Sequence, residues 1–294
     1  MPTNWDSAVR EVLARNLPDF RVETITSLGA GRDNAAFGVN GVLVVRFSTE
    51  PDASLRAGVV ASEAQLLEMV AITSPLPVPV PRFVDTDAGC IGYDKLSGTP
   101  LLHLPPTELG PHADGVAAKL GGFLSAVHDL PLDCVATLVD PDHVPMHEWL
   151  HEAAAYHATL ADQVPVEHRP AVLEFLAEDP PPADYEPVFS HNDLGVEHVL
   201  VDLDTWDVTG VIDWTDAAIV DPAFDFANLH RDLGPNALTT ALRNYPRADP
   251  AKIAERATFY ARCTVFEDLE HGIATSQHAY VEKCRASLTW LFPN

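Results

Sequence analysis

Residues 190–198 read Ser-His-Asn-Asp-Leu-Gly-Val-Glu-His, and residues 211–214 read Val-Ile-Asp-Trp. Short apolar segments around them predict strands, so the polar residues lie in a loop between strands. Phosphoryl transfer needs a carboxylate beside the attacking hydroxyl and oxygen ligands that hold Mg²⁺ against the nucleotide phosphates. Asp193, in the loop, and Asp213, at the end of a strand, are candidates for these two roles.

The spacing within the loop supports this interpretation. A protein-kinase catalytic loop has the pattern H-R-D-x-x-x-x-N, and a second acid at a nearby strand end holds the metal ions. His191, Asp193 and His198 occupy the H, D and N positions, and Asp213 that of the second acid. A chain with 43 acidic residues and 13 histidines produces His-x-Asp by chance, so the flanking strands carry much of the argument.

A glycine-rich segment near the N-terminus is a second candidate for phosphate binding. Residues 28–34 read Leu-Gly-Ala-Gly-Arg-Asp-Asn, and Asn40-Gly41 predicts a type I′ turn before the next strand. Gly29 and Gly31 would allow the backbone to approach a phosphate closely. The segment lacks the Gly-Lys-Ser/Thr of a Walker loop and the strand-to-helix setting of a dinucleotide fold. A Gly-x-Gly pair in a hairpin is otherwise simply a turn.

The next strand, over 42–47, carries Arg46 within an apolar run, and the following helix places Glu63 on its apolar stripe. A carboxylate on the buried face of a helix is costly unless it is paired. We therefore expect an ion pair between Arg46 and Glu63, equivalent to the Lys–Glu pair that binds nucleotide phosphates in kinases. The alternative is that Glu63 lies at the rim of the stripe and contacts solvent.

The composition limits the classes of function. Of 294 residues, 47% are apolar and 21% are charged, which is typical of globular proteins. The formal net charge is −25, so binding to nucleic acid is disfavoured. An acidic surface attracts cationic ligands, although the acid excess can equally serve solubility alone.

The sequence also indicates the cellular location of the protein. No apolar run reaches the roughly 18 residues that a membrane helix needs, and residues 1–6 lack the order of a signal peptide. The four cysteines lie far apart, without a Cys-x-x-Cys pair, at Cys90, Cys134, Cys263 and Cys284. We expect reduced thiols in a cytoplasmic protein that does not bind membranes and is a monomer.

Hydrophobic periodicity predicts an α+β architecture in two lobes. Residues 1–96 are expected to form a small N-terminal β-sheet lobe, and residues 97–294 a larger, mostly helical lobe that carries the catalytic-loop sequence. The site would lie in a cleft between the lobes. The expected helices cover 4–17, 57–72, 116–127, 146–160, 170–177, 224–231, 250–269 and 277–291, and the expected C-terminal strands 187–190, 199–201 and 208–213.

With these motifs the chain resembles the aminoglycoside and macrolide phosphotransferases, antibiotic kinases with a protein-kinase-like fold, over nearly its whole length. The His-Asn-Asp of the loop, with its later His, is similar to kinases of the aminoglycoside 2″-hydroxyl. Residues 212–215, Ile-Asp-Trp-Thr, are similar to the macrolide kinases. Residues 91–99, Ile-Gly-Tyr-Asp-Lys-Leu-Ser-Gly-Thr, look like the family's hinge, where backbone groups contact the nucleobase.

The resemblance implies that the N-terminal lobe, residues 1–96, binds nucleotide and that the C-terminal lobe, residues 97–294, holds the catalytic loop and the acceptor site. It also implies a role for each candidate residue. Asp193 would be the catalytic base, and His198 and Asp213 would be the Mg²⁺ ligands. His191 and Asp225 would support the catalytic loop. The residues expected to bind ATP or GTP are Gly29, Gly31, Arg46, Glu63, Tyr93, Lys95 and Leu96.

Two positions depart from the wider family. Most members have Asn at the position of His198, and Mg²⁺ prefers oxygen to imidazole nitrogen. The later His also occurs in the two subfamilies named above, so it is a variant of the motif. Arg46 replaces the usual Lys, which keeps the positive charge but exchanges a compact ammonium for a planar fork.

The function that the resemblance implies is Mg²⁺-dependent transfer of a nucleoside triphosphate γ-phosphate to a hydroxyl of an antibiotic, which would confer resistance. An aminoglycoside is the first candidate, because Asp232, Glu267 and Asp268 could bind its ammonium groups; the alternative is that these acids form a solvated helix surface. A macrolide is the second, in a largely apolar pocket with a single acid. A small-metabolite kinase and a catalytically silent nucleotide-binding pseudokinase remain as further alternatives.

Overall fold

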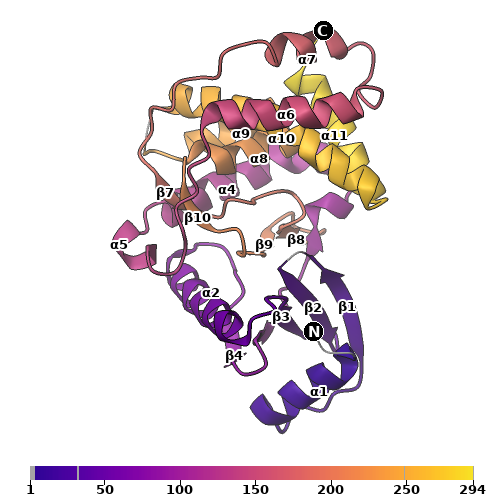
Figure 1. The fold of residues 1–294 in the computed structure, drawn as a ribbon, viewed down its shortest axis with the longest axis vertical. Coiled ribbons are helices and arrows are strands. Elements are labelled where there is room, and N and C mark those ends of the chain that lie inside the picture. Colours follow the sequence, from indigo (N-terminus) through magenta and orange to yellow (C-terminus); the bar gives the residue numbers. More distant parts are fainter. Residues whose placement is uncertain (1–3, 32, 248, 294) are drawn as a thin grey trace. The chain divides into compact units, whose positions relative to one another are not determined.

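The computed structural model describes residues 4–31, 33–247 and 249–293. The fold is α+β, with an antiparallel sheet in the N-terminal part and a mostly helical C-terminal part, as predicted (Figure 1). The chain forms two compact units: residues 1–97 with 209–215, and residues 98–208 with 216–294.

The first unit contains a later segment of the chain as well as its N-terminal part, so it does not end at the predicted boundary, residue 96. Residues 209–215 were expected in the helical lobe, but they belong to the first unit. The Val211 N–H donates to the carbonyl of Pro77 at 2.9 Å, and the Asp213 carboxylate pairs with Arg46 at 3.0 Å. These contacts join segments far apart in the sequence, so local patterns do not reveal them.

The first unit holds a five-stranded antiparallel sheet in the order β1-β2-β3-β5-β4, with two helices. The expected turn between β2 and β3 is present, with Asn40 and Gly41 at φ 53° and 72°. The elements are α1 (Trp5–Asn16), β1 (Ile25–Ala30), β2 (Asn34–Val39), β3 (Leu43–Ser48), α2 (Ala53–Thr73), β4 (Pro81–Asp85) and β5 (Cys90–Asp94). Side chains of α1 pack with those of β2 and β3 in one apolar core that includes Val9, Leu13, Phe37 and Val45.

Helix α2 begins four residues before its predicted start at 57, because Asp52 caps it. The Asp52 carboxylate accepts hydrogen bonds from the backbone N–H groups of Ser54 at 2.8 Å and Leu55 at 3.3 Å. A side chain that satisfies these otherwise unpaired donors fixes the helix start. The apolar stripe used for the prediction begins further along the helix, at Val59.

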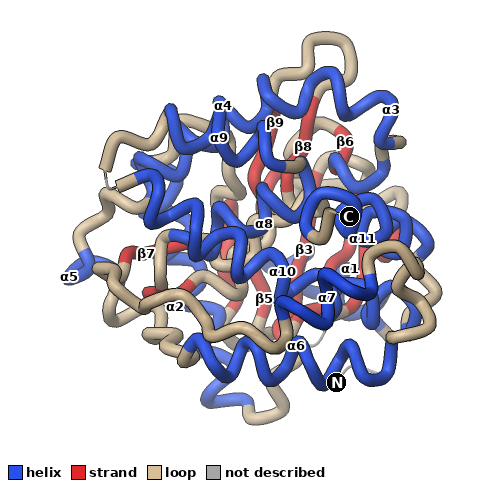
Figure 2. Tube along the Cα trace, turned by 90° about the horizontal axis from the view of Figure 1, so that it is seen from above, coloured by secondary structure: helices blue, strands red, loops and turns tan. Residues whose placement is uncertain are grey.

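The second unit is built around helix α10, which packs against α6, α8 and α11, while α4 packs against α9 (Figures 1 and 2). Its helices of seven residues or more are α4 (Ala113–Val127), α6 (Met146–Leu160), α7 (Arg169–Phe175), α8 (Ala223–Leu233), α9 (Pro235–Arg243), α10 (Pro250–Ala274) and α11 (His278–Leu291). Shorter helical segments are η1 (Leu101–His103), α3 (Pro106–Leu109), η2 (Gly110–His112) and α5 (Leu132–Val135).

Short strands frame the catalytic-loop sequence within this unit. Strand β7 (Val188–Ser190) pairs with β10 (Ala218–Val220), and β6 (Thr99–Pro100) pairs with β8 (Val199–Val201), both antiparallel. β9 (Val208–Val211) carries the chain from the second unit into the first. The sequence did not predict β6 or β10; β6 has only two residues, too few to show an alternating pattern.

Two neighbouring glycines in α4 provide a matched test of the α4–α9 contact. A Cβ on Gly121 would overlap the carbonyl oxygen and Cα of Ala241, whereas a Cβ on Gly122 would meet no heavy atom within 4 Å. We expect Gly121→Ala to lower the free energy of unfolding by about 1–3 kcal/mol through overpacking. Gly122→Ala should raise it by about 0.5–1 kcal/mol, because Ala favours the helix. Urea denaturation measures both, and equal effects would contradict the observed packing.

Among the described residues, no helix combines the length and the apolar character needed to cross a membrane. All four cysteines are free thiols; Cys90, Cys263 and Cys284 are buried, and Cys134 is exposed.

Candidate active site

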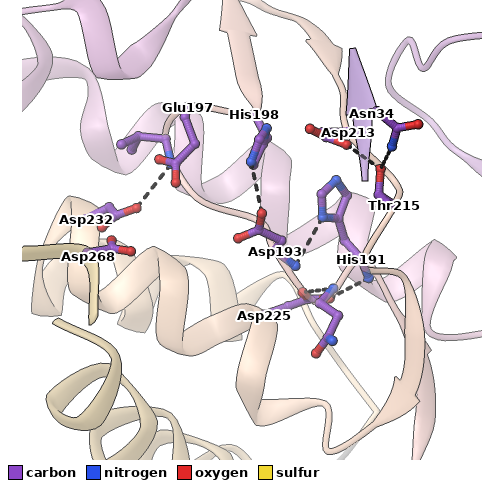
Figure 3. A network of polar contacts seen from close by, with 12 residues as sticks. Asn34, His191, Asp193, Glu197, His198, Asp213, Thr215, Asp225, Asp232 and Asp268 are labelled. Atoms are coloured by element: carbon purple, nitrogen blue, oxygen red, sulfur yellow. Dashed lines mark hydrogen bonds and ion pairs between the residues drawn. The ribbon is translucent and has the colours of Figure 1, made fainter. Parts of the chain in front are cut away.

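The catalytic-loop sequence lies between β7 and β8, and Asp193 is its central acid. The His198 Nε2 atom lies 3.0 Å from the Asp193 carboxylate (Figure 3). Burial by itself would raise the pKa of Asp193, but the hydrogen bond from His198 and the charges of His198, His191 and Arg231 together lower it to about 2. Asp193 is therefore ionised at neutral pH and acts as an acceptor, so His198 donates through Nε2–H.

The start of the loop is held by Asp225, on α8. This buried carboxylate accepts the backbone N–H groups of His191 at 3.1 Å and Asn192 at 2.9 Å (Figure 3). Asn192 has a φ of 64°, in the left-handed region, which asparagine adopts more readily than most other non-glycine residues. Asp225 therefore fixes the backbone immediately before Asp193.

The sequence did not indicate two further residues that support Asp225, namely His128 and Tyr245. The His128 Nε2 atom lies 3.0 Å from the Asp225 carboxylate, and the His128 Nδ1 atom lies 2.9 Å from the Tyr245 hydroxyl. His128 directly follows the predicted helical stripe of α4, but nothing in the local sequence points to partners about a hundred residues away. A histidine at the end of an apolar helix is the single signal that the sequence offered.

Two of the three acids expected to bind substrate are engaged inside the protein. Asp232 is buried and contacts the Arg231 guanidinium at 2.8 Å, and it accepts the Val196 N–H at 3.1 Å. Asp268 contacts the Lys283 ammonium at 2.8 Å and Arg231 at 3.1 Å. Buried carboxylates are stable only with such partners. Asp232 and Asp268 are thus paired with cations of the protein itself, and their expected contact with a substrate stays a prediction.

Glu267, the third expected acid, is different because its side chain is exposed. Partial desolvation and the charge of Asp268 raise its pKa above the ordinary value, with further contributions from Glu152 and Asp193. Glu152, on α6, is also exposed and was not singled out from the sequence. The acids around Asp193 thus repel one another, and a bound cation would relieve that repulsion.

The expected ion pair between Arg46 and Glu63 is present in the first unit. Arg46, on β3, is 8% exposed, and its guanidinium also contacts the Asp213 carboxylate at 3.0 Å and the Thr215 hydroxyl at 2.8 Å. Asn34 donates to the same hydroxyl at 3.1 Å (Figure 3). Asp213 was expected to face a metal ion, and in this structure it is the second carboxylate partner of Arg46.

The glycine-rich segment forms the end of β1 and its turn into β2. Gly29 has a φ of 153° at an irregularity in the β1–β2 register, and the Gly31 N–H donates to the carbonyl of Asn34 at 2.9 Å. A Cβ on either glycine would meet nothing within 4 Å, so the backbone here is open on the side where a Cβ would project. This is the kind of surface that a phosphate group can approach.

The expected hinge, residues 91–99, begins within β5 and continues beyond its end at Asp94. Tyr93 lies in that strand opposite Val44, and burial raises the pKa of its hydroxyl above the ordinary value. The Lys95 N–H donates to the carbonyl of Val42 at 2.8 Å, so this N–H is used within the sheet. Leu96, half-buried, is the next residue of the segment.

The residues present partly match the chemistry of a divalent cation. Ligand atoms of Asp193, Glu197 and His198 lie within 4.8 Å of one another in the second unit. Carboxylate oxygens suit Mg²⁺, and the imidazole of His198 is a softer donor than Mg²⁺ usually takes.

The chain matches known proteins over most of its length. The model of the phosphotransferase enzyme family matches residues 24–258. The GDP and kanamycin complex of APH(2″)-IIia is 21% identical, with 95% of this chain and 96% of that chain covered and a TM-score of 0.70. The macrolide 2′-phosphotransferase MphH from Brachybacterium faecium is 24% identical, with 96% and 98% covered and a TM-score of 0.64. The streptomycin–ATP–APH(2″)-IIa ternary complex is 19% identical, with 98% and 97% covered and a TM-score of 0.59. At these identities the likeness establishes the fold.

Proposed function

Since the chain belongs to the phosphotransferase enzyme family and is a nucleotide-dependent phosphotransferase, we propose that its acceptor is a hydroxyl group of an antibiotic. The observation that supports this proposal most directly is the ionised Asp193, hydrogen-bonded to His198 on a loop that Asp225 braces. An aminoglycoside and a macrolide are the two candidate acceptors, and the proposed role is resistance to the drug.

The proposed mechanism assigns one task to each group. Asp193 orients the attacking hydroxyl and takes its proton, while Arg46, held by Glu63, binds the nucleotide phosphates. Asp213 and His198 are the proposed Mg²⁺ ligands, and the ion would neutralise charge on the transferred phosphoryl group. Transfer then depends on positioning and on charge stabilisation more than on proton abstraction.

The charges near Asp193 bear on the choice of acceptor. Glu267 and Glu152 are exposed acids that could bind ammonium groups, which favours a cationic drug. An aminoglycoside has several ammonium groups, whereas a macrolide has one dimethylamino group. Because Asp232 and Asp268 are paired with Arg231 and Lys283, fewer acids are available than the sequence suggested. This specific observation keeps the macrolide as a second candidate.

A transfer assay tests the proposal. Purified protein with Mg²⁺ and either ATP or GTP is incubated with kanamycin, streptomycin, a macrolide, sugars and amino alcohols, and products are identified by mass spectrometry. We expect one phosphoryl group to be added to at least one antibiotic. Growth of a host that carries the gene, on the same drugs, tests resistance. Transfer to metabolites alone would indicate a metabolite kinase, and nucleotide binding without transfer would indicate a pseudokinase.

A further inference from the structure

A buried lysine from the last helix reaches the second half of the catalytic loop. Lys283, on α11, is 7% exposed, and its ammonium lies 3.2 Å from Glu197, 2.8 Å from Asp268 and 3.4 Å from Asp232. It also lies 4.8 Å from the centre of the Tyr280 ring. Burial would lower the pKa of Lys283, but the three carboxylates raise it well above the ordinary value. Lys283 is therefore a permanent cation at the centre of an acidic cluster.

The Glu197 carboxylate lies directly beside Gly195. A Cβ on Gly195 would lie 2.6 Å from the carboxyl carbon of Glu197, so the Glu197 side chain occupies the space that any other residue at 195 would fill. The Glu197 side chain is 11% exposed, and a carboxylate so buried needs a cationic partner. Lys283 supplies that partner.

A second contact holds the same stretch of backbone. Asp232 accepts the Val196 N–H at 3.1 Å, and it is fixed in turn by Arg231 and Lys283. The cluster therefore binds the loop twice, through a side chain at 197 and through the backbone at 196. His198, which donates to Asp193, is the next residue.

We propose that Lys283 is a positioning residue for phosphoryl transfer, which holds Glu197 and thereby keeps the His198 ring against the Asp193 carboxylate. Asp225 fixes the loop before Asp193, and Lys283 with Asp232 fixes it after Asp193. The kinetic part of this inference rests on the proposed function. The structural part, that Lys283 sets the environment of His198, does not.

The first test therefore needs no activity. In two-dimensional ¹H–¹⁵N spectra of the folded protein, the imidazole signals of His198 are identified by their loss in His198→Ala. Lys283→Met and Glu197→Gln should both shift these signals, because each breaks the pair that places residue 197. Lys252→Met is the matched control, since Lys252 makes an exposed ion pair with Asp184 at 2.6 Å. Unchanged His198 signals in either folded test variant would overturn the inference.

The second test is kinetic. Loss of a residue that orients a catalytic group lowers activity by roughly 10–100-fold, so we expect that fall in kcat for Lys283→Met, with little change in KM for the nucleotide. Lys283→Arg should restore part of kcat, because it keeps the charge. Glu197→Gln should lower kcat similarly, and the double variant should be no worse than either single variant.

The outcomes separate the two proposals. Wild-type protein that transfers no phosphate contradicts the proposed function, and the His198 signals still decide the positioning role. A folded Lys283→Met protein with wild-type kcat contradicts that role alone. If Lys283→Met does not fold, the His198 signals and kcat are measured on Glu197→Gln instead. This variant removes only the negative charge that Lys283 attracts.

Discussion

Asp193→Asn is expected to lower kcat for phosphoryl transfer by about 10²- to 10⁴-fold, the range of a general base that is lost. The amide keeps the size of the side chain but cannot accept the proton of the attacking hydroxyl. The Asp193 side chain is 40% exposed, so its replacement leaves the core intact. Steady-state kinetics with the best acceptor from the transfer assay measure the effect, and circular dichroism verifies the fold.

Asp184→Asn is the control for this experiment, because Asp184 lies on the surface and pairs only with Lys252 among the ion pairs of the described residues. An activity of Asp193→Asn within a few-fold of the wild type would contradict the assignment.

Acid denaturation tests the lowered pKa of Asp193 independently of activity. The pKa of Asp193 is about 2 in the folded protein, below the ordinary value of 3.8, so its ionised form stabilises the fold above about pH 4. That contribution should disappear between about pH 4 and pH 2, and the stabilities of the wild type and Asp193→Asn should converge there.

Asp213→Asn is the second large effect that we expect, a loss of activity on the order of 10²- to 10³-fold. A metal ion contributes several kcal/mol of charge stabilisation in a transition state, and each 1.4 kcal/mol corresponds to about a factor of ten in rate. The amide is a weaker metal ligand than the carboxylate, and it also removes a charge that pairs with Arg46. Assays over a range of Mg²⁺ concentrations should show a higher Mg²⁺ requirement as well as a lower rate.

Thr215→Val separates the two contributions of Asp213. The Thr215 hydroxyl contacts both Arg46 and Asp213, at 2.8 Å in each case, so its loss disturbs the ion pair and leaves the carboxylate in place. A small effect of Thr215→Val beside a large one of Asp213→Asn would agree with a metal ligand. An unchanged Mg²⁺ requirement in Asp213→Asn would contradict that role.

The sequence predicted those features that a local pattern encodes. The apolar run around Arg46 and the stripe around Glu63 were sufficient for their ion pair, because a buried charge on each of two adjacent elements needs a partner. The Asn40-Gly41 turn followed from backbone conformation alone. The α+β class followed from the change in periodicity along the chain.

The remaining features depend on contacts between distant segments. Arg231 neutralises Asp232 and Asp268, and Lys283 completes the cluster from a helix about fifty residues later. From the sequence, the acids of this cluster appeared available to a substrate, because the two cations lie outside any recognisable motif. The contacts of His128 could not be predicted for the same reason. Its partners Asp225 and Tyr245 come close to it only when the helices pack together.

The membership of residues 209–215 in the first unit has a consequence for biosynthesis. A ribosome makes the sheet of this unit before it makes Asp213, so the Arg46–Glu63 pair precedes its second carboxylate on the growing chain. An N-terminal piece without residues 209–215 would lack part of the unit that holds the proposed phosphate-binding residues. A truncated message that ends before residue 209 would therefore yield a sheet without the acid proposed to hold the metal ion, and so no partial enzyme.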